Sequence, residues 1–409
     1  MKLSVIVCVY NTKKEYLTEC LSSIRAEALA DPELILIDDG SDTDYTDQAR
    51  IYGARYVRTE NRGLLAARLR GIEESRGDYI AFVDSDDTVS LNYHLPMLAA
   101  AERTAADIVV NGWAYHTPSG RRCVDDFTAR GGITLSGDDI LRTFCGAEGR
   151  DHSVYVQWNK IFSQRLAQRT LAHFRSTDIP DRHLTYGEDI LMNFCNFSLA
   201  ERLTVVSSGF YFYRTHADQC TRPPTESALT LQIDSAGFIF DTLLCELRSR
   251  ASSDELERGL LSWRAMLART HYAYARAGGY RALYGRIREI YGVQRLSMPT
   301  VEDQRVYLRS ELLGENFREI DSALTALFFT HGDLRVSVEE SCRYVRRIIE
   351  CYDGLKERRT VLDPAAKTKI PKRRIKRLHL IIHSPTVSSL GARLIRKGSR
   401  LRAFLKERL

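Results

Sequence analysis

The first 110 residues alternate short apolar runs, rich in β-branched residues, with segments whose apolar residues recur at helical spacing. The apolar runs are typical of strands buried on both faces, and they cover Leu3–Tyr10, Glu33–Asp38, Arg55–Thr59 and Asp78–Asp84. The helix-compatible segments between them lie near 14–27, 43–52 and 63–76. Strands that alternate with helices predict βαβ units, and so an α/β fold with a mostly parallel sheet and flanking helices.

The pattern changes further along the chain. Residues 107–215 continue as mixed α and β, with a helix expected after Gly187 and a strand over Leu203–Arg214. From about Leu229 the periodicity becomes that of long helices, over 229–250, 253–277 and 336–358. Paired prolines at 223 and 224 favour an extended connection. We therefore expect an α/β domain over 1–222 in two halves (1–105 and 106–222), an all-helical domain over 223–360, and a tail over 361–409.

Composition narrows the class of protein. Of 409 residues, 44% are hydrophobic and 27% charged, which is an ordinary globular balance. The chain runs from Met1 straight into an apparent strand, so we expect no signal peptide. We also expect no membrane-spanning run of about 18 apolar residues. Nine cysteines, scattered singly and odd in number, indicate reduced thiols in a cytosolic protein rather than disulfides or a zinc site.

The net charge of +6 is unevenly distributed. Residues 356–409 contain 17 Lys or Arg and 3 Asp or Glu, a net charge of +14, which leaves −8 for the rest. Leucines near one helical face of 390–405, among basic residues, are typical of an amphipathic helix that lies on an anionic membrane surface. A solvated basic end and a nucleic-acid tail are the alternatives. We expect no nucleic-acid partner, because no recognised binding module accompanies the tail.

Three of the expected strands end in polar residues that can carry chemistry. These ends are Tyr10-Asn11-Thr12, Asp38-Asp39-Gly40-Ser41 and Asp84-Ser85-Asp86-Asp87. Ligands of open parallel sheets bind beyond the carboxyl ends of the strands, and crowded carboxylates suit Mg²⁺ or Mn²⁺ that bridges a diphosphate. Each feature alone also fits a plainer interpretation: a helix N-cap for the acidic cluster, a turn for Asp39-Gly40, and a solvated surface side chain for Arg68.

Taken as a set, these segments resemble the inverting family-two glycosyltransferases of the GT-A fold. The resemblance covers about residues 1–222. It rests on Val5–Asn11, Ile37–Asp42, Asn61-Arg62-Gly63 with Ala67-Arg68, Asp78–Asp87, Trp158-Asn159-Lys160, Gly187-Glu188-Asp189 and Tyr211–Arg214. Leu69 departs from the pattern, because the family often has Asn there. The resemblance makes 1–105 the nucleotide-sugar half and 106–222 the acceptor half.

The resemblance also implies roles for single residues. Tyr10 would stack on the base of a uridine nucleotide, and Asp39 would accept a hydrogen bond from a ring N–H. The remaining donor contacts would come from Val9, Asn61, Arg68, Asp84 and Ser85. Asp86 would be the direct ligand of Mn²⁺ or Mg²⁺, with Asp84 beside it and His216 as a conceivable third ligand or an ordinary polar residue. Asp87 would contact the sugar or cap a helix.

Transfer with inversion needs a base that removes the proton of the incoming hydroxyl. The resemblance gives this role to Asp189, with Glu188 orienting the acceptor or supporting Asp189; a helix start rich in negative charge is the alternative. Trp158 is expected to contact the acceptor or else to lie in the core.

The resemblance implies a bacterial enzyme of surface-polysaccharide synthesis that moves a sugar from a UDP-sugar to a glycan or lipid-linked acceptor. With the basic tail, it predicts a cytoplasmic protein peripheral to the inner face of the membrane, with homo-oligomers open. A sugar-phosphate nucleotidyltransferase and a non-catalytic nucleotide-sugar-binding scaffold are the alternatives.

Overall fold

The computed structural model of the chain describes residues 1–117, 120–123, 131–146, 152–179, 182–214, 225–250 and 253–297. By its internal contacts the chain divides into Met1–Val306, which contains all of these residues, and Tyr307–Leu409. The expected helix over 336–358, the proline-rich boundary at 222–224 and the basic tail lie outside the described residues. The domain limits given above therefore stay predictions.

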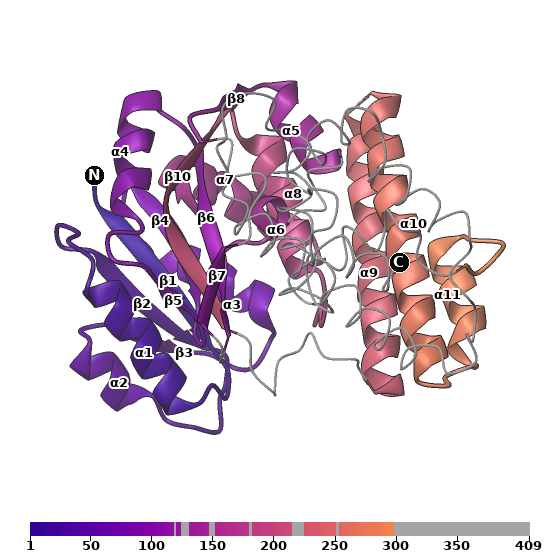
Figure 1. The fold of residues 1–409 in the computed structure, drawn as a ribbon, viewed down its shortest axis with the longest axis horizontal. Helices are drawn as coiled ribbons and strands as arrows, with labels where there is room; N and C mark the ends of the chain where they lie inside the picture. The colour runs from indigo at the N-terminus through magenta and orange to yellow at the C-terminus, as the bar shows by residue number, and fades with distance from the viewer. Residues whose placement is uncertain are drawn as a thin grey trace, which may run out of the picture. The chain divides into compact units, whose positions relative to one another are not determined.

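One sheet forms the centre of the first unit (Figure 1). Its strands are β1 (Leu3–Val9), β2 (Glu33–Asp38), β3 (Arg55–Arg58), β4 (Tyr79–Asp84), β5 (Thr88–Val89), β6 (Ile108–Thr117), β7 (Gly120–Cys123), β8 (Thr134–Ser136), β9 (Lys160–Ser163) and β10 (Arg202–Arg214). The helices are α1 (Lys14–Arg25), α2 (Thr46–Ile51), α3 (Leu64–Glu74), α4 (Leu95–Thr104), α5 (Asp138–Cys145), α6 (His152–Tyr155), α7 (Gln164–Arg175), α8 (Glu188–Leu199), α9 (Glu226–Ser249), α10 (Asp254–Ala277) and α11 (Leu283–Tyr291).

The strand order is β3-β2-β1-β4-β9-β6-β10-β5, with β7 beside β6 and β8 beside β10. The four strands expected in the first 110 residues form one parallel block, β3-β2-β1-β4. Strand β9 runs antiparallel to both β4 and β6, and β10 runs parallel to β6. The predicted α/β class with a mostly parallel sheet and flanking helices is confirmed, and the antiparallel strands β5, β7, β8 and β9 add to it.

Alternation along the strands builds a core on each face of the sheet. In β1, Val5 and Val7 pack toward α1 and α4, whereas Ile6 packs toward α3, α7 and α8. Side chains of successive strand residues point to opposite faces, so a continuous apolar run fills both cores. Figure 1 shows the resulting layers, with α1, α2 and α4 on one side of the sheet and α3, α7 and α8 on the other.

The helical region begins as expected, with α9 and α10 as a long antiparallel pair (Figure 1). Both helices share a hydrophobic core with the face of the sheet that α3, α7 and α8 cover. The ring of Trp263 on α10 lies 5.8 Å from that of Phe144 on α5 and 5.5 Å from that of Phe240 on α9. Helix α9 is long and apolar enough to cross a membrane by length and composition, with a mean hydropathy of 1.3. Half of that stretch is buried inside the protein, as in the core helix of a folded domain.

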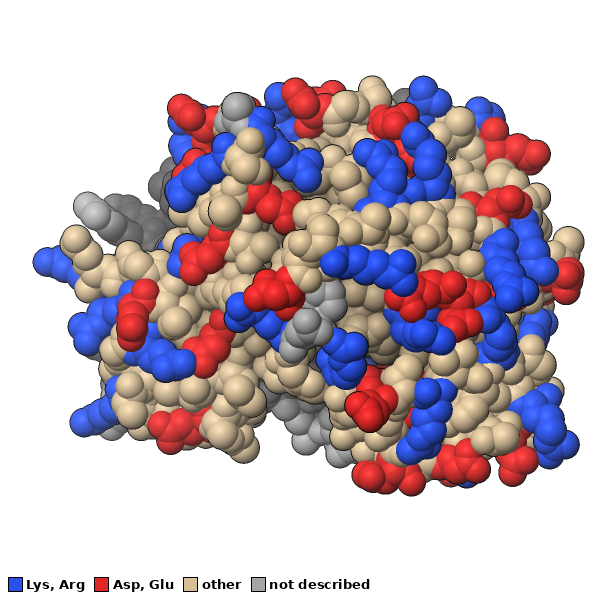
Figure 2. Space-filling model, turned by 180° about the vertical axis from the view of Figure 1, so that it is seen from behind, with Lys and Arg blue, Asp and Glu red and all other residues tan. Residues whose placement is uncertain are grey.

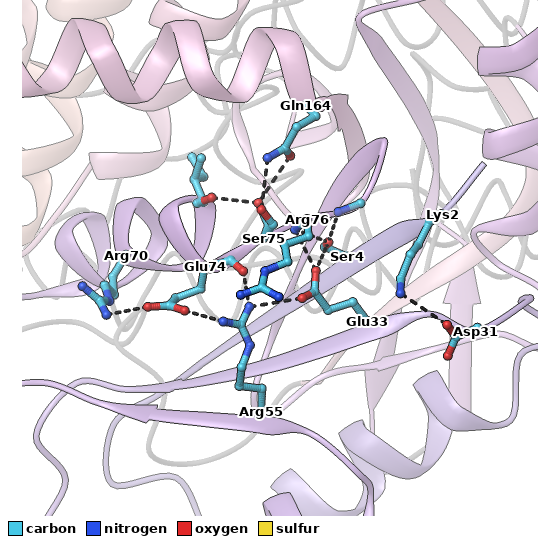
Figure 3. Close-up of polar contacts among 12 residues, drawn as sticks. Lys2, Ser4, Asp31, Glu33, Arg55, Arg70, Glu74, Ser75, Arg76 and Gln164 are labelled. Carbon is cyan, nitrogen blue, oxygen red and sulfur yellow. Dashed lines mark hydrogen bonds and ion pairs between the residues drawn. The ribbon is translucent and has the colours of Figure 1, made fainter.

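The amino ends of β1, β2 and β3 are tied to the end of α3 by charged side chains (Figure 3). Glu33 accepts hydrogen bonds from the Ser4 hydroxyl at 2.5 Å and from the Arg76 N–H at 2.8 Å. Arg55 binds Glu33 at 3.1 Å and also pairs with Glu74, the last residue of α3. This network stabilises the end of the sheet at which the strands begin, opposite to the end that carries the polar residues.

Candidate active site

The carboxyl ends of β1 and β2 hold the residues expected to bind a nucleotide. Tyr10 follows β1 directly and is 53% exposed, so its ring is open to a stacking partner. Asp39 is buried and accepts hydrogen bonds from the backbone N–H groups of Arg62 and Gly63, both at 2.9 Å. Asp39 thereby fixes the loop that carries Asn61, which is exposed. Each carboxylate oxygen can accept a second hydrogen bond, so Asp39 keeps capacity for a base N–H.

Gly40 is needed for this arrangement. Its backbone has φ +75°, and a Cβ atom built on it would lie 2.7 Å from the Asn61 nitrogen. Only glycine tolerates both the left-handed conformation and this approach. The Asp39-Gly40 pair is thus a turn, as the plainer interpretation holds, and it also brings two loops of the nucleotide side together.

The β4 end contributes Asp84 and Ser85. Asp84 is part-buried, with 28% of its side chain exposed. The Ser85 hydroxyl lies 2.7 Å from that of Thr12, which ties the ends of β4 and β1 together. Val9 is buried, and its carbonyl accepts the Asp39 N–H at 3.0 Å. Val9 and Ser85 therefore support the floor of the site rather than present free side chains to a donor.

Asp87 has neither of its expected roles. It is 1% exposed, and its two oxygens accept the Tyr211 hydroxyl and the Arg214 N–H, each at 2.7 Å. The next helix, α4, begins only at Leu95. Asp87 thus connects the acidic loop to β10 instead of contacting a sugar or capping a helix.

Arg68 joins the two halves of the site. Its guanidinium pairs with Asp189 at the start of α8, lies 3.3 Å from Asp84 at the end of β4, and lies 3.8 Å from Glu188. The arginine is 1% exposed, so the solvated interpretation is wrong. It shares the buried face of α3 with Leu65 and Ile72, three residues before it and four after. The packing of α3 therefore places this charge between Asp84 and Asp189.

Burial and charge set the protonation of this cluster. Burial raises the pKa of Asp189 to about 7 and that of Asp84 to about 6, while the positive charge of Arg68 opposes both shifts. Burial acts to lower the pKa of Arg68, but the three carboxylates outweigh it, so that pKa is raised and the guanidinium stays charged. Asp189 thus changes charge near neutral pH, as a general base must.

The donor set fits a divalent cation only together with a substrate. Among the described residues, no group of three or more His, Cys, Asp or Glu side chains is placed to hold a metal ion alone. Mg²⁺ in such sites commonly takes one or two carboxylates and completes its shell with water and phosphate oxygens. Asp84 and Asp86, two residues apart at a strand end, meet that requirement. His216 lies outside the described residues.

The structure corrects the expected acceptor contact of Trp158. The indole is 2% exposed and stacks on Tyr211 with ring centres 4.3 Å apart, and Trp113 packs against it edge-on at 5.3 Å. The ring therefore belongs to the core beneath the site, which was the alternative interpretation. Its neighbour Gln157 is also buried and supports the start of α8 from below, because its amide donates to the Asp189 backbone carbonyl at 3.4 Å.

Two residues of β10 were not assigned roles from the sequence. The Tyr211 hydroxyl accepts the Asp84 N–H at 3.0 Å as it donates to Asp87, and the Arg214 side chain donates to the Asp86 carbonyl at 2.7 Å. Both residues fix the acidic loop from the far side. Their place in Tyr211-Phe212-Tyr213-Arg214, part of the family resemblance, was the signal that could have marked them.

Comparisons with known proteins place the chain among glycosyltransferase-like sequences. Residues 4–166 match the family model described as Glycosyl transferase family 2. Two relatives come from Bacillus subtilis (strain 168): "Uncharacterized glycosyltransferase EpsJ", 30% identical over 56% of this chain and 65% of its own length, and "Putative glycosyltransferase EpsH", 28% identical over 58% of this chain and 69% of its own. The chain thus spans about two thirds of the length of these relatives.

Among solved structures, S. aureus TarS 1-349 in complex with UDP matches with a TM-score of 0.49 and 17% identity, covering 87% of this chain and 90% of that one. The family match and the named relatives support a glycosyltransferase domain. Residues 4–166 are therefore similar to glycosyltransferase family 2, and the mixed sheet with its flanking helices is GT-A-like.

Proposed function

We propose that the protein is an inverting glycosyltransferase that moves a sugar from a UDP-sugar to a hydroxyl group of a glycan or lipid-linked acceptor. The observation that carries this proposal is the position of Arg68 between two carboxylates of different origin, Asp84 at the end of β4 and Asp189 at the start of α8. A carboxylate on the donor side and another on the acceptor side, in one crevice, suit direct displacement without a covalent intermediate.

On the donor side, Tyr10 stacks on the uracil, Asp39 accepts its N–H, and Asn61 lies at the rim of the pocket. Asp84 and Asp86 would be the residues that hold a Mn²⁺ or Mg²⁺ ion. When bound there, the ion supplies Lewis-acid stabilisation of the charge on the departing UDP. Arg68, which stays charged, adds a second positive group beside the diphosphate.

On the acceptor side, Asp189 removes the proton of the attacking hydroxyl group. At the same time the oxygen of that hydroxyl group bonds to the anomeric carbon. The bond from that carbon to the diphosphate oxygen breaks, and its electron pair leaves with UDP. Attack from the face opposite UDP inverts the configuration. Glu188, 16% exposed beside Arg68, helps to orient the acceptor.

The setting we propose is surface-polysaccharide synthesis on the cytoplasmic side of a bacterial membrane, with the protein attached to the membrane periphery. Similarity to EpsJ and EpsH supports a glycosyltransferase, and the basic tail supports the membrane.

A product assay tests the reaction class. Incubation with UDP-sugars and Mn²⁺ is expected to release UDP, faster when acceptor is present. Release of pyrophosphate from UTP and a sugar phosphate would identify a nucleotidyltransferase instead. Tight UDP-sugar binding without turnover under any acceptor would identify a scaffold.

A further inference from the structure

The loop that leads into Glu188 and Asp189 rests on the helical region. Residues 182–187 precede α8, and α9 passes directly beside them. The Thr185 N–H donates to the Ser235 hydroxyl of α9 at 3.3 Å, and the two hydroxyl groups also lie 3.3 Å apart. Ser235 is 8% exposed whereas Thr185 is exposed, so these contacts are partly shielded from water.

Two further contacts extend this support along one face of α9. The guanidinium of Arg182 lies over the ring of Phe238, 4.4 Å from its centre. Gly187, at φ +83°, is the N-cap of α8, and a Cβ atom there would lie 2.9 Å from the Ile239 Cδ1 atom. Gly187, just before Glu188, thus packs closely against α9, and this contact positions the first turn of α8.

Helices α10 and α11 support the same loop from a second direction. The ring of Tyr186 lies edge-on against His271 of α10, with ring centres 5.8 Å apart. His271 is buried, and its Nδ1 atom lies 2.6 Å from the hydroxyl of Tyr291, the last residue of α11. The loop, α10 and α11 are therefore joined through one chain of polar and aromatic contacts, which is buried at His271 and Tyr291.

The donor side is held differently. Asp39 and Asp84 take their positions from the ends of β2 and β4 and from hydrogen bonds within the sheet half of the site. Arg68 links Asp84 to Asp189, but among the described residues Asp39 has no such link. A disturbance of α9 should therefore move the acceptor-side carboxylates far more than the nucleotide contacts.

From these contacts we infer that Ser235, Phe238 and Ile239 of α9 are positioning residues for Asp189. The helical region is then a working part of the active site and not an appended domain. This inference rests on the proposed function, because it assigns a consequence to the position of the proposed base.

A double variant, Ser235→Ala with Phe238→Ala, tests the inference in the full-length protein. Displacement of reacting groups by about 1 Å can cost about 100-fold in rate. We expect the kcat for sugar transfer to fall about 10- to 100-fold, with the Kd for UDP and Mn²⁺ changed less than about 2-fold. If Phe238 is changed to Tyr instead of Ala, the ring over Arg182 is kept, and most of the rate lost in the double variant should be restored.

A matched control is Leu231→Ala, on the same helix but with a side chain 53% exposed. It should leave kcat, the Kd for UDP and the denaturation midpoint unchanged. A loss of donor affinity in parallel with kcat, or a loss of rate fully explained by an unfolded fraction, would show that α9 only stabilises the fold.

A second measurement separates this inference from the proposed function. Trypsin cleavage after Arg182 reports on the loop without any substrate, and it should be faster in the double variant than in the wild type and in Leu231→Ala. If the wild type turned over no donor but the double variant was still cleaved faster after Arg182, the proposed reaction would fail and the loop support would stand. Equal cleavage and equal kcat in all variants would overturn the inference.

Discussion

Arg68 is the residue at which the electrostatics of the site are decided. A buried guanidinium without partners is costly, and so are buried carboxylates without partners. Here the single positive charge of Arg68 faces three carboxyl groups, those of Asp189, Asp84 and Glu188. When two or more of them are ionised, negative charge remains that Arg68 does not balance. In the proposed mechanism a divalent cation beside Asp84 would supply that balance, which is a physical reason to expect metal-dependent donor binding.

The proposed base predicts the effect of Asp189→Asn. The amide keeps the size of the side chain and a hydrogen bond but cannot take a proton. We expect kcat to fall by about 10²- to 10⁴-fold, the range for a positioned general base. Calorimetric titration with UDP and Mn²⁺ should give a nearly normal Kd. A collapse of donor affinity with a high residual rate would make Asp189 a donor-site residue.

The raised pKa of Asp189 predicts a pH dependence. Because burial raises this pKa to about 7, the base is protonated below neutral pH and ionised above it. The kcat/KM for transfer should therefore rise with pH up to a plateau above about pH 7. This rise should be absent in the Asp189→Asn variant. The same shift means that the folded state binds the proton more tightly than the unfolded state. The stability owed to this group is therefore present at low pH and lost as pH rises through 7. A flat profile from pH 5.5 to 8.5 would contradict the assignment.

Asp86 is the residue on which metal binding depends in the proposed mechanism. Its backbone carbonyl is held by Arg214, so Asp86→Ala should leave the loop and the fold intact. We expect this variant to lose Mn²⁺-dependent UDP binding, measured by thermal shift, while the shift given by UDP alone is kept. Activity that is undiminished in the variant and insensitive to a chelator would remove the metal from the mechanism.

At the scale of elements, the parallel block was predictable because each strand is a short apolar run followed by a polar end. Strand β2 was predicted over Glu33–Asp38 and begins and ends at those residues. The insertion of β9 between β4 and β6 was not predictable, since Lys160–Ser163 is only four residues long and finds its partners at long range.

The site shows the same limit. The polar strand ends marked Asp39 and Asp84 as candidates, and the family resemblance gave them their roles. The pairing of Arg68 with Asp189 joins residues 121 positions apart, and no local pattern encodes it. That the Arg68 side chain points into the protein could have been inferred, because Leu65, Arg68 and Ile72 are spaced to lie on one face of α3. Trp158 was uncertain because an indole suits a core and a sugar surface equally well.

The charged network at the amino ends of the strands predicts a change in stability without a change in chemistry. Arg55→Ala leaves Glu33 and Glu74 part-buried without their shared partner (Figure 3). We expect a loss of about 1–2 kcal/mol in the free energy of unfolding, measured by urea denaturation. UDP affinity should stay at the wild-type value, because the network lies at the opposite edge of the sheet. Arg50→Ala, whose ion pair with Asp47 is exposed, is the control and should change stability by less than about 0.5 kcal/mol. Equal effects of the two variants would show that the network does not hold the edge.

At the scale of the whole molecule, charge separates the tail from the rest of the chain. The last 54 residues carry a net charge of +14 and the remaining residues −8. On the face shown in Figure 2, Lys and Arg side chains are interspersed with Asp and Glu. Such a surface offers little attraction to an anionic bilayer, so any electrostatic attachment should depend on the tail.

This separation predicts that the tail anchors the protein to anionic membranes. Each Lys or Arg near an anionic leaflet contributes about 1 kcal/mol, and the contribution decays over the screening length, about 8 Å at physiological ionic strength and about 3 Å at 1 M. The intact protein should sediment with vesicles that contain anionic lipid, and less so as salt is added. Replacing the five basic residues of 372–377 with Gln should weaken binding. Deleting the residues after Asp363 should abolish binding and preserve UDP-sugar hydrolysis. A variant with Leu390, Leu394, Leu401 and Leu405 changed to Ser keeps the charge and isolates the contribution of the apolar face. Equal binding to neutral and anionic vesicles, or none to either, would leave the tail as a contact for a protein partner.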